Sequence, residues 1–338
     1  MPACTLTGAS TERMDASSHV AARPQGLLAR LRPAHLGDFV FEKTTLLFAS
    51  TVLLVIIAML AQMVENAMPT LRGLGIDFVI GSDWNPPADH FGALPFVYGT
   101  IVTSVIALVV AVPISLAIAI FVTYQAPIRI RRPVISMVEL LAAIPSVAYG
   151  LWGIFVLVPF MRDVVTPFLR STLGFLPIFQ GPSFGIGMLT AGLILAIMVT
   201  PIITAVSRDV LAAVPGHQRD GALALGATPW EAVRVVFHYA LPGITGAIIL
   251  GLARAVGETM AVTMVIGNRA DIATSLFAPA YSMASVIANE FPEANTKLYL
   301  SALIEVGVLL FAVSFIVRGA AQVLVWRATR GRTIGREA

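Results

Sequence analysis

The sequence contains little charge and a single cysteine. Charged residues make up 12% of its 338 residues and hydrophobic residues 57%, with a mean hydropathy of +0.85, whereas about 25% of a soluble domain is charged. Cys4 has no partner for an intrachain disulfide, and its polar surroundings argue against metal binding. The composition therefore excludes an ordinary soluble domain and predicts an integral membrane protein.

Hydrophilic stretches long enough to form a separate domain are also missing from the sequence. It has no glycine-rich phosphate-binding loop, no pair of histidines at zinc spacing and no nucleophile elbow. We therefore expect no catalytic activity, no cofactor, no metal site and no nucleic-acid partner for this chain.

The chain does contain apolar runs of about 20 residues, the length of a helix that crosses a hydrocarbon core about 30 Å thick. Six such runs are predicted to be transmembrane helices: 44–64, 99–122, 133–160, 185–207, 241–267 and 298–320. The predicted fold is all-α, with residues 44–320 forming one six-helix transmembrane domain. Prolines within several runs, Pro145 and Pro159 among them, favour bent or broken helices, although proline is also common in ordinary membrane helices.

The distribution of basic residues predicts the orientation. They gather in the two terminal segments, 1–43 and 321–338, and are scarce in the loops 65–98, 161–184 and 268–297. Because Lys and Arg stay on the cytoplasmic side, both termini of this multi-pass plasma-membrane protein are predicted to be cytoplasmic. The first segment lacks an apolar core, so we expect no cleavable signal peptide and little order in residues 1–43.

Two charged residues, Arg254 and Glu258, interrupt the fifth apolar run. Each such charge costs about 2.5–3.5 kcal/mol at the centre of a spanning helix, and intramembrane charges usually pair, line a water-filled path or contact a substrate. Their spacing of four residues places them on one face of a continuous helix. Arginine followed by glutamate is the less favourable order for supporting a helix, so intrahelical stabilisation is a weak explanation for the pair and a functional role is favoured.

The inward loop 208–240 has the pattern of a docking element. An alanine-rich helical turn is ended by Gly226, and Thr228 is placed to cap a second helix that begins at Pro229. The sequence therefore predicts two short amphipathic helices in an L shape on the cytoplasmic face.

Within this loop, Asp220-Gly221-Ala222 followed by Gly226 resembles the EAA loop of ABC importer permeases. In that family the loop is a coupling helix that fits a cleft on the ATPase subunit, and its small residues allow close approach. The sequence departs from the family pattern in having Asp-Gly-Ala for Glu-Ala-Ala, and in placing Leu-Pro, at 241–242, three residues late. The alternative is an amphipathic loop that lies on the lipid surface.

Several further stretches are similar to the permease C subunit of phosphate-specific ABC importers, over nearly all of residues 40–320. They are Phe91-Gly92-Ala93-Leu94, Tyr98-Gly99-Thr100, Arg254-Ala255-Val256-Gly257-Glu258-Thr259-Met260-Ala261-Val262 and Asn289-Glu290-Phe291. The resemblance implies the type I ABC importer permease architecture. It also implies as partners a homologous second permease of the A type, an ATPase subunit dimer inside and a phosphate-binding protein outside.

On this resemblance Arg254, Glu258 and Thr259 line the substrate pathway. A guanidinium offers the planar, multidentate donors that suit phosphate, and a nearby carboxylate keeps the empty site near neutral and accepts the hydrogen of a protonated phosphate oxygen. Thr259 would add a hydroxyl donor, or would bond back to its own helix. The alternative for the pair Arg254–Glu258 is a buried ion pair that fixes packing against the partner permease.

Three secondary features complete the prediction. Ala253, Gly257 and Ala261 recur every four residues and predict close packing against a neighbouring helix. Arg269, at the outer end of the fifth run, either gathers anions or snorkels to the interface. Trp84, in the first outer loop, either contacts the binding protein or is an aromatic interface anchor.

Other functions remain open at this point. The first is a permease for another tetrahedral oxyanion, such as sulfate or molybdate. The second is a secondary anion transporter that uses Arg254–Glu258 as a gate or proton relay, although no inverted repeat is visible. A membrane scaffold is the weakest alternative, because it leaves the intramembrane charges without a purpose.

Overall fold

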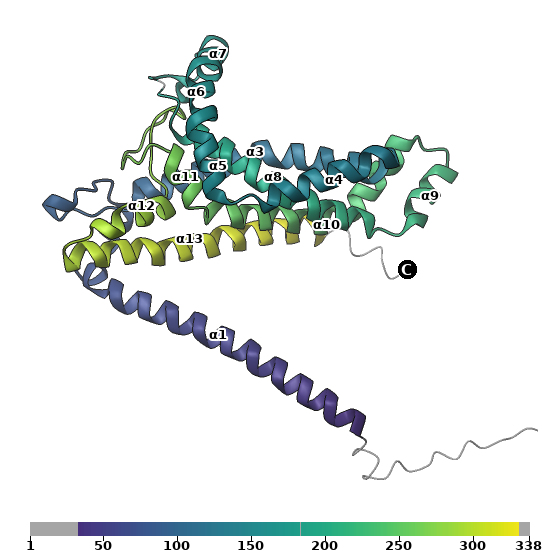
Figure 1. Ribbon diagram of the computed structural model, residues 1–338, viewed down its shortest axis with the longest axis horizontal. Coiled ribbons are helices and arrows are strands. Elements are labelled where there is room, and N and C mark those ends of the chain that lie inside the picture. Colours follow the sequence, from purple (N-terminus) through teal and green to yellow (C-terminus); the bar gives the residue numbers. More distant parts are fainter. Residues whose placement is uncertain (1–32, 183, 331–338) are drawn as a thin grey trace, which may run out of the picture. The chain divides into compact units, whose positions relative to one another are not determined.

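The computed structural model describes residues 33–182 and 184–330, and helices account for most of them (Figure 1). The α-helices are α1 (Pro33–Gly73), α2 (Ile76–Ile80), α3 (Leu94–Ile120), α4 (Ile128–Ala143), α5 (Ser146–Trp152), α6 (Val158–Phe160), α7 (Thr166–Leu173), α8 (Met188–Ala212), α9 (Gly216–Ala224), α10 (Pro229–Val256), α11 (Met260–Val265), α12 (Met283–Glu290) and α13 (Lys297–Arg330). The π-helical turns are η3 (Phe121–Gln125), η4 (Gly153–Leu157) and η5 (Met161–Val165), and the 3₁₀ turns are η2 (Pro86–Ala88), η6 (Pro177–Phe179) and η7 (Phe291–Glu293).

Six helices of the described part are long and apolar enough to cross a membrane. They are Gly37–Gly73, Leu94–Gln125, Ser146–Leu173, Met188–Ala212, Pro229–Val256 and Lys297–Val323. This confirms the predicted all-α membrane fold with six spans. The first, second, fourth and sixth helices overlap the predicted runs closely, whereas the third and fifth begin and end elsewhere.

The chain divides into residues 1–58 and residues 59–338. The described part of the first unit is the beginning of α1, whose residues 37–58 are all exposed. The helix starts at Pro33, so residues 33–43 are helical although they were predicted to be poorly ordered, and residues 1–32 lie outside the described residues. From residue 46 to residue 58 this helix is apolar on all sides except for Ser50 and Thr51, which bond back to Leu47. A helix of this kind is covered by lipid or by another protein.

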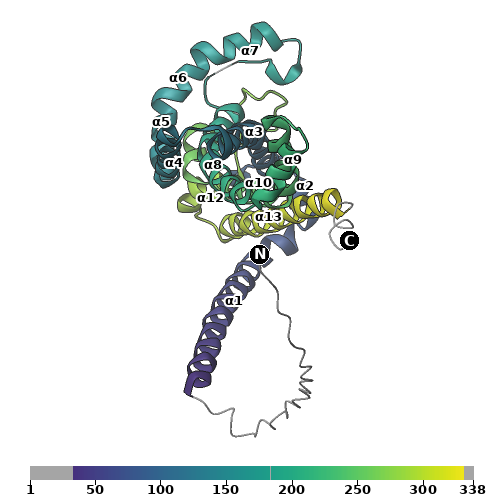
Figure 2. The same cartoon turned by 90° about the vertical axis from the view of Figure 1, so that its right-hand side faces the viewer.

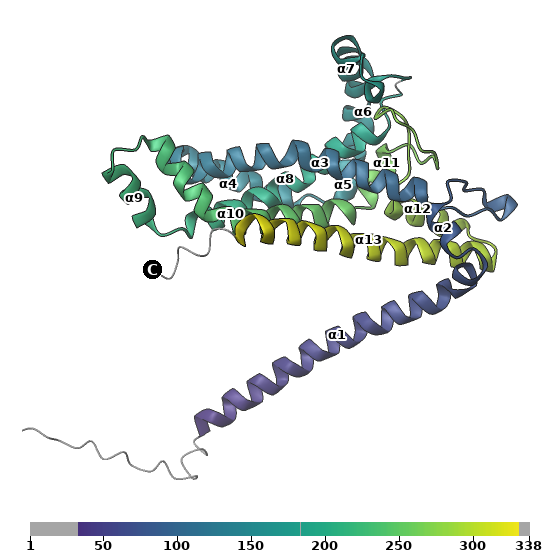
Figure 3. The same cartoon turned by 180° about the vertical axis from the view of Figure 1, so that it is seen from behind.

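The predicted third span, 133–160, is interrupted at Ile144 and Pro145, which are extended. Proline has no N–H for the helical ladder and clashes with the preceding turn, so α4 ends at Ala143 and α5 begins at Ser146. Figures 1 and 3 show α4 and α5 running along α8, while α6 and α7 turn away from it. Of the bend or break that the prolines predict, the structure has a break at Pro145, and the helical stretch continues beyond the predicted end at residue 160.

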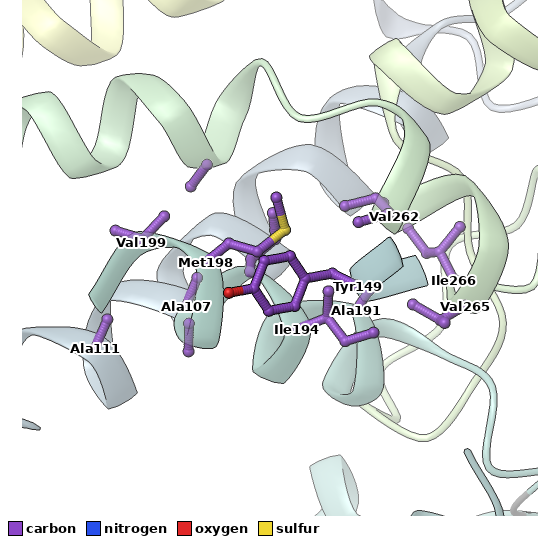
Figure 4. Packing of buried hydrophobic residues seen from close by; sticks show 14 of the residues in the cluster. Ala107, Ala111, Tyr149, Ala191, Ile194, Met198, Val199, Val262, Val265 and Ile266 are labelled. Carbon is purple, nitrogen blue, oxygen red and sulfur yellow. The ribbon is translucent and has the colours of Figure 1, made fainter. Parts of the chain in front are cut away.

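The main core lies between α3 and α8, with α5, α10 and α11 around it (Figure 4). The buried face of α3 repeats a small residue every four positions: Gly99, Thr103, Ala107, Ala111, Ser115 and Ala119. Small residues allow the backbones of membrane helices to approach closely. At the facing Gly192, an added Cβ would lie 2.5 Å from Cγ2 of Ile106, so only glycine fits there. This core holds α10 in place, and α10 carries the candidate site at one end and the docking loop at the other.

Candidate functional site in the fifth span

The fifth span ends before it reaches Glu258. α10 stops at Val256, Gly257 follows with φ −92°, and α11 starts at Met260. The predicted helix 241–267 is therefore broken, and Arg254 and Glu258 do not lie on one face of a continuous helix. They still meet, because Nη2 of Arg254 lies 3.3 Å from Oε2 of Glu258 across the break.

The break also changes the electrostatic reason for the pair. Arg254 lies in the last turn of α10, where a cation interacts favourably with the negative end of the helix dipole. Glu258 lies beyond the end of α10, so the rule for the order of charges within a continuous helix does not apply to the pair. Ending the helix therefore removes the conflict that the sequence presents.

The two side chains of the pair differ in burial. The Glu258 side chain is 5% exposed, whereas the Arg254 side chain is 49% exposed. A buried carboxylate needs a partner, and Arg254 supplies it while keeping other N–H donors accessible at the surface of this chain. Glu258 therefore has its partner within the chain, and Arg254 carries the more accessible charge of the two.

Thr259 lies in the break, at the start of α11, and makes no side-chain capping bond. The back-bonded hydroxyl predicted there occurs one turn later, where Thr263 Oγ1 donates to the Thr259 carbonyl at 2.7 Å. The Thr259 side chain is half-buried, and its place on the substrate pathway stays a prediction.

The predicted small-residue stripe Ala253, Gly257 and Ala261 is not one stripe, because the helix ends between its members. Close packing does occur, but it joins α11 to α5. A Cβ added at Gly150 of α5 would lie 3.3 Å from Cα of Ala261. This packing therefore fixes α11, the helix that follows the break.

The outer residues of the fifth run have local partners. Asn268, with φ +50°, donates its amide to the Thr263 carbonyl at 3.0 Å. Arg269 is exposed and forms an ion pair with Asp271. These contacts hold both side chains in the loop after α11, where Arg269 shares its charge with a carboxylate.

Trp84 is half-buried and lies in an aromatic cluster of the chain itself, and its two predicted roles stay predictions. Its ring packs edge-on against Phe91 and Phe96, and its Nε1 donates to Oε2 of Glu290 at 2.8 Å. Tyr299 donates to the same oxygen at 2.7 Å. Glu290 therefore ties the first outer loop to α12 and α13, a link between residues far apart in sequence that no local pattern signals.

Tyr281 belongs to the same region and packs edge-on against Phe96. Its hydroxyl accepts from the Asn289 amide at 3.2 Å, and burial raises the pKa of this phenol above its ordinary value. It therefore stays neutral at physiological pH. The stretch Asn289-Glu290-Phe291, noted above for its resemblance, thus contributes its first two residues to fixing this end of the fold.

A second buried carboxylate, Glu305 of α13, was missed by the sequence reasoning. It is 5% exposed, and its Oε2 has no hydrogen-bond partner within the described residues. The available signal was the same as for Glu258, a lone acidic residue in the middle of an apolar run.

At the opposite end of α10, the loop 208–240 forms α9 and the start of α10. Gly226 has φ +88°, a left-handed conformation that glycine adopts without strain. Thr228 accepts from the Glu231 N–H, and Glu231 accepts from the Thr228 N–H at 2.8 Å, so a capping box begins α10 at Pro229 as predicted. The second helix is not short, however, because it continues without a break into the fifth span.

The side chains of the loop are largely open. Asp220 and Gly221 are exposed and Ala222 is half-buried. The side chains of Leu225 and Trp230 are 92% and 62% exposed. Exposed apolar groups are found at surfaces that contact another protein or a membrane, so both alternatives for this loop stay open.

One contact links α9 to the second span. The Arg219 guanidinium lies 5.7 Å from the ring centre of Tyr124 in η3, and Tyr124 donates its hydroxyl to the Leu211 carbonyl at 2.8 Å. The interaction of a cation with an aromatic face is attractive at this distance. This contact joins α9 to the π-helical turn that follows α3.

Together, the six spans, the intramembrane ion pair and the exposed loop define a multi-pass membrane transport component. Residues 111–330 match the family described as "Binding-protein-dependent transport system inner membrane component", and the chain belongs to this family. It is the permease component of an ABC importer, a class that works with ATPase and substrate-binding partners.

Curated relatives share most of their length with this chain. It is 45% identical over 298 residues to "Phosphate transport system permease protein PstC" of Pasteurella multocida, covering 87% of this chain and 93% of that protein. It is 39% identical over 258 residues to "Probable phosphate transport system permease protein PstC" of Methanocaldococcus jannaschii, covering 75% and 82%. A solved structure, the inward-facing MetNI methionine ABC transporter, aligns with a TM-score of 0.48 and 22% identity over 70% of this chain and 94% of that one.

Proposed function

We propose that this chain is the transmembrane permease subunit of an ATP-driven importer and forms, with a second permease, the pathway for inorganic phosphate. The observation that carries the proposal is the half-exposed Arg254, held by the buried Glu258 inside a transmembrane domain. The names of the relatives point to phosphate as the cargo. The guanidinium is the side chain best suited to this anion.

In the mechanism, Arg254 binds the passing phosphate and Glu258 positions Arg254. Holding one edge of the guanidinium against a buried carboxylate leaves the other N–H groups to the anion. The shared charge weakens the attraction, so phosphate is released rather than trapped in the membrane. High affinity then resides in an extracytoplasmic phosphate-binding protein. Thr259 adds a hydroxyl beside the path.

The ATPase dimer binds the loop that contains Asp220, Gly221, Ala222 and Gly226. The small and exposed residues of α9 allow a cleft on the partner to close around it, and ATP hydrolysis takes place on those partners rather than on this chain. The orientation that fits this assignment has α9 and both termini in the cytoplasm. The A-type second permease completes the path beside Arg254.

Uptake of labelled phosphate in cells with this chain as the sole copy of the subunit tests the proposal. At equal membrane levels, Arg254→Gln is expected to abolish uptake while the complex assembles and hydrolyses ATP. Arg254→Lys is expected to recover only part of it, because an ammonium has no planar fork. Arg269→Gln, which changes an exposed arginine that already has a partner, is the control and should transport normally.

Three results would contradict the proposal. Normal uptake by Arg254→Gln would mean that the ion pair serves helix packing and not transport. If sulfate or molybdate competed for the pathway and phosphate did not, the cargo would be one of those oxyanions instead of phosphate. Uptake that survives ATP depletion and follows the proton gradient would indicate a secondary transporter.

A further inference from the structure

A second group of arginines lies away from both the fifth span and the docking loop, on the segment formed by α6, η5 and α7. This segment turns away from the other helices at the end of the bundle far from α9 (Figures 1 and 2). It carries a concave site of about 390 Å³ that is lined by Arg162, Thr166, Pro167, Arg170 and Ser171. Neither the transport path nor the ATPase contact uses these residues.

The segment is two-sided. Arg162, Thr166 and Arg170 recur every four residues and share the side that forms the concave site. Two positions earlier, Phe160, Val164 and Phe168 recur at the same spacing, and all three are exposed. In α7, at 3.6 residues per turn, an offset of two residues is about 200°, so Phe168 lies nearly opposite Thr166 and Arg170. Arg162 and Val164 belong to the π-helical turn η5.

Hydrogen bonds fix the two guanidinium groups without using all of their donors. Arg162 donates from Nε and Nη2 to the two carboxylate oxygens of Asp163, at 2.8 and 3.1 Å. Arg170 donates from Nη2 to the Gly181 carbonyl, which ties α7 to the loop before α8. Each arginine retains N–H groups on Nη1, so the site combines prepositioned donors with a net charge of one, from two arginines and one aspartate.

We propose that this site binds the phosphodiester headgroup of an anionic phospholipid, while the Phe160, Val164 and Phe168 stripe enters the acyl-chain boundary. The segment is the end of the third candidate span, Ser146–Leu173, and arginines near the end of a spanning helix reach the headgroup level of the bilayer. Guanidinium groups bind phosphate oxygens directionally. A monoanionic phosphodiester matches the single net charge, and the apolar stripe distinguishes a lipid from free phosphate.

The site does not depend on the cargo of the transporter, so its test reads lipid binding rather than uptake. The assembled transporter is reconstituted in nanodiscs with spin-labelled phosphatidylglycerol or spin-labelled phosphatidylcholine, and the immobilised fraction of each lipid is measured. The wild type is expected to immobilise more phosphatidylglycerol. The variant R162Q/R170Q is expected to reduce this preference several-fold, and R269Q, the matched exposed and paired arginine, should preserve it.

Two further variants distinguish the roles of the arginine donors and of the apolar stripe. R162K/R170K keeps the charge but removes the planar donors, so a partial loss is expected, and it serves as the test if the glutamine variant fails to assemble. F160S/F168S should weaken the immobilisation of both lipids. An unchanged preference in both arginine variants would overturn the proposal. So would displacement of the labelled lipid by millimolar inorganic phosphate, which would identify a free-phosphate site.

Discussion

At its first residue α10 is fixed by neighbours in the chain, and at its last residue by groups from other helices. Thr228 and Glu231 close a capping box around Pro229, and all three residues are exposed. At the other end, Gly257 has no left-handed conformation to stop the helix. There Glu258 is buried, and α11 packs against α5 and α8. A helix end in contact with solvent can therefore be fixed by residues adjacent in sequence. A helix end that positions an intramembrane charge needs contacts from other helices.

The largest effect is expected from breaking the charge pair at the buried end. Arg254→Gln leaves Glu258 buried without its partner, and truncating one member of a buried charge pair costs about 2–5 kcal/mol. The lower part of that range is expected here because Arg254 is half exposed. Unfolding of the purified chain in detergent measures the loss.

The double variant Arg254→Gln/Glu258→Gln separates packing from transport. Removing both charges should restore most of the stability, because no unpaired carboxylate remains. Phosphate uptake should stay lost, because the anion ligand is gone. Recovery of uptake together with stability would show that the pair serves packing alone.

The exposed end of α10 should respond as an ordinary helix cap. Thr228→Ala removes the side-chain acceptor, and loss of such a cap costs about 1 kcal/mol. The same unfolding assay measures it, and Thr245→Ala is the control, since Thr245 only bonds back to Leu241 and Pro242 within α10. Equal losses in the two variants would mean that the capping box does not stabilise the helix.

The smallest effect is expected at Gly257, which follows the last residue of α10 and does not cap the helix in the way that Thr228 caps its start. An added Cβ would lie 3.6 Å from the Ala253 carbonyl oxygen, an ordinary contact, and φ is negative. Gly257→Ala should therefore change stability by less than about 1 kcal/mol, the difference in helix propensity between the two residues, and uptake should persist. A complete loss of uptake would show that this glycine itself sets the break.

Local patterns predicted the turn and the helix cap of the loop 208–240. Gly226 and Thr228 lie where the sequence places them, since turn and cap preferences act over a few residues. The same reasoning failed for the stripe Ala253, Gly257 and Ala261, because it assumed a continuous helix. It also missed the bond from Trp84 to Glu290, because its two residues are separated by most of the chain.

The sequence by itself determined the membrane environment, the number of spans, a bend or break at Pro145, and a pair of charged residues, Arg254 and Glu258, within the fifth apolar run. Hydrophobic length and proline geometry act within a single segment, so they can be read without knowing the neighbours. Only the tertiary structure decided where α10 ends, which member of the charge pair is buried, and that α6 and α7 turn away from α8. Those outcomes depend on which surfaces α5, α8 and α11 offer, and these meet only when the chain is folded.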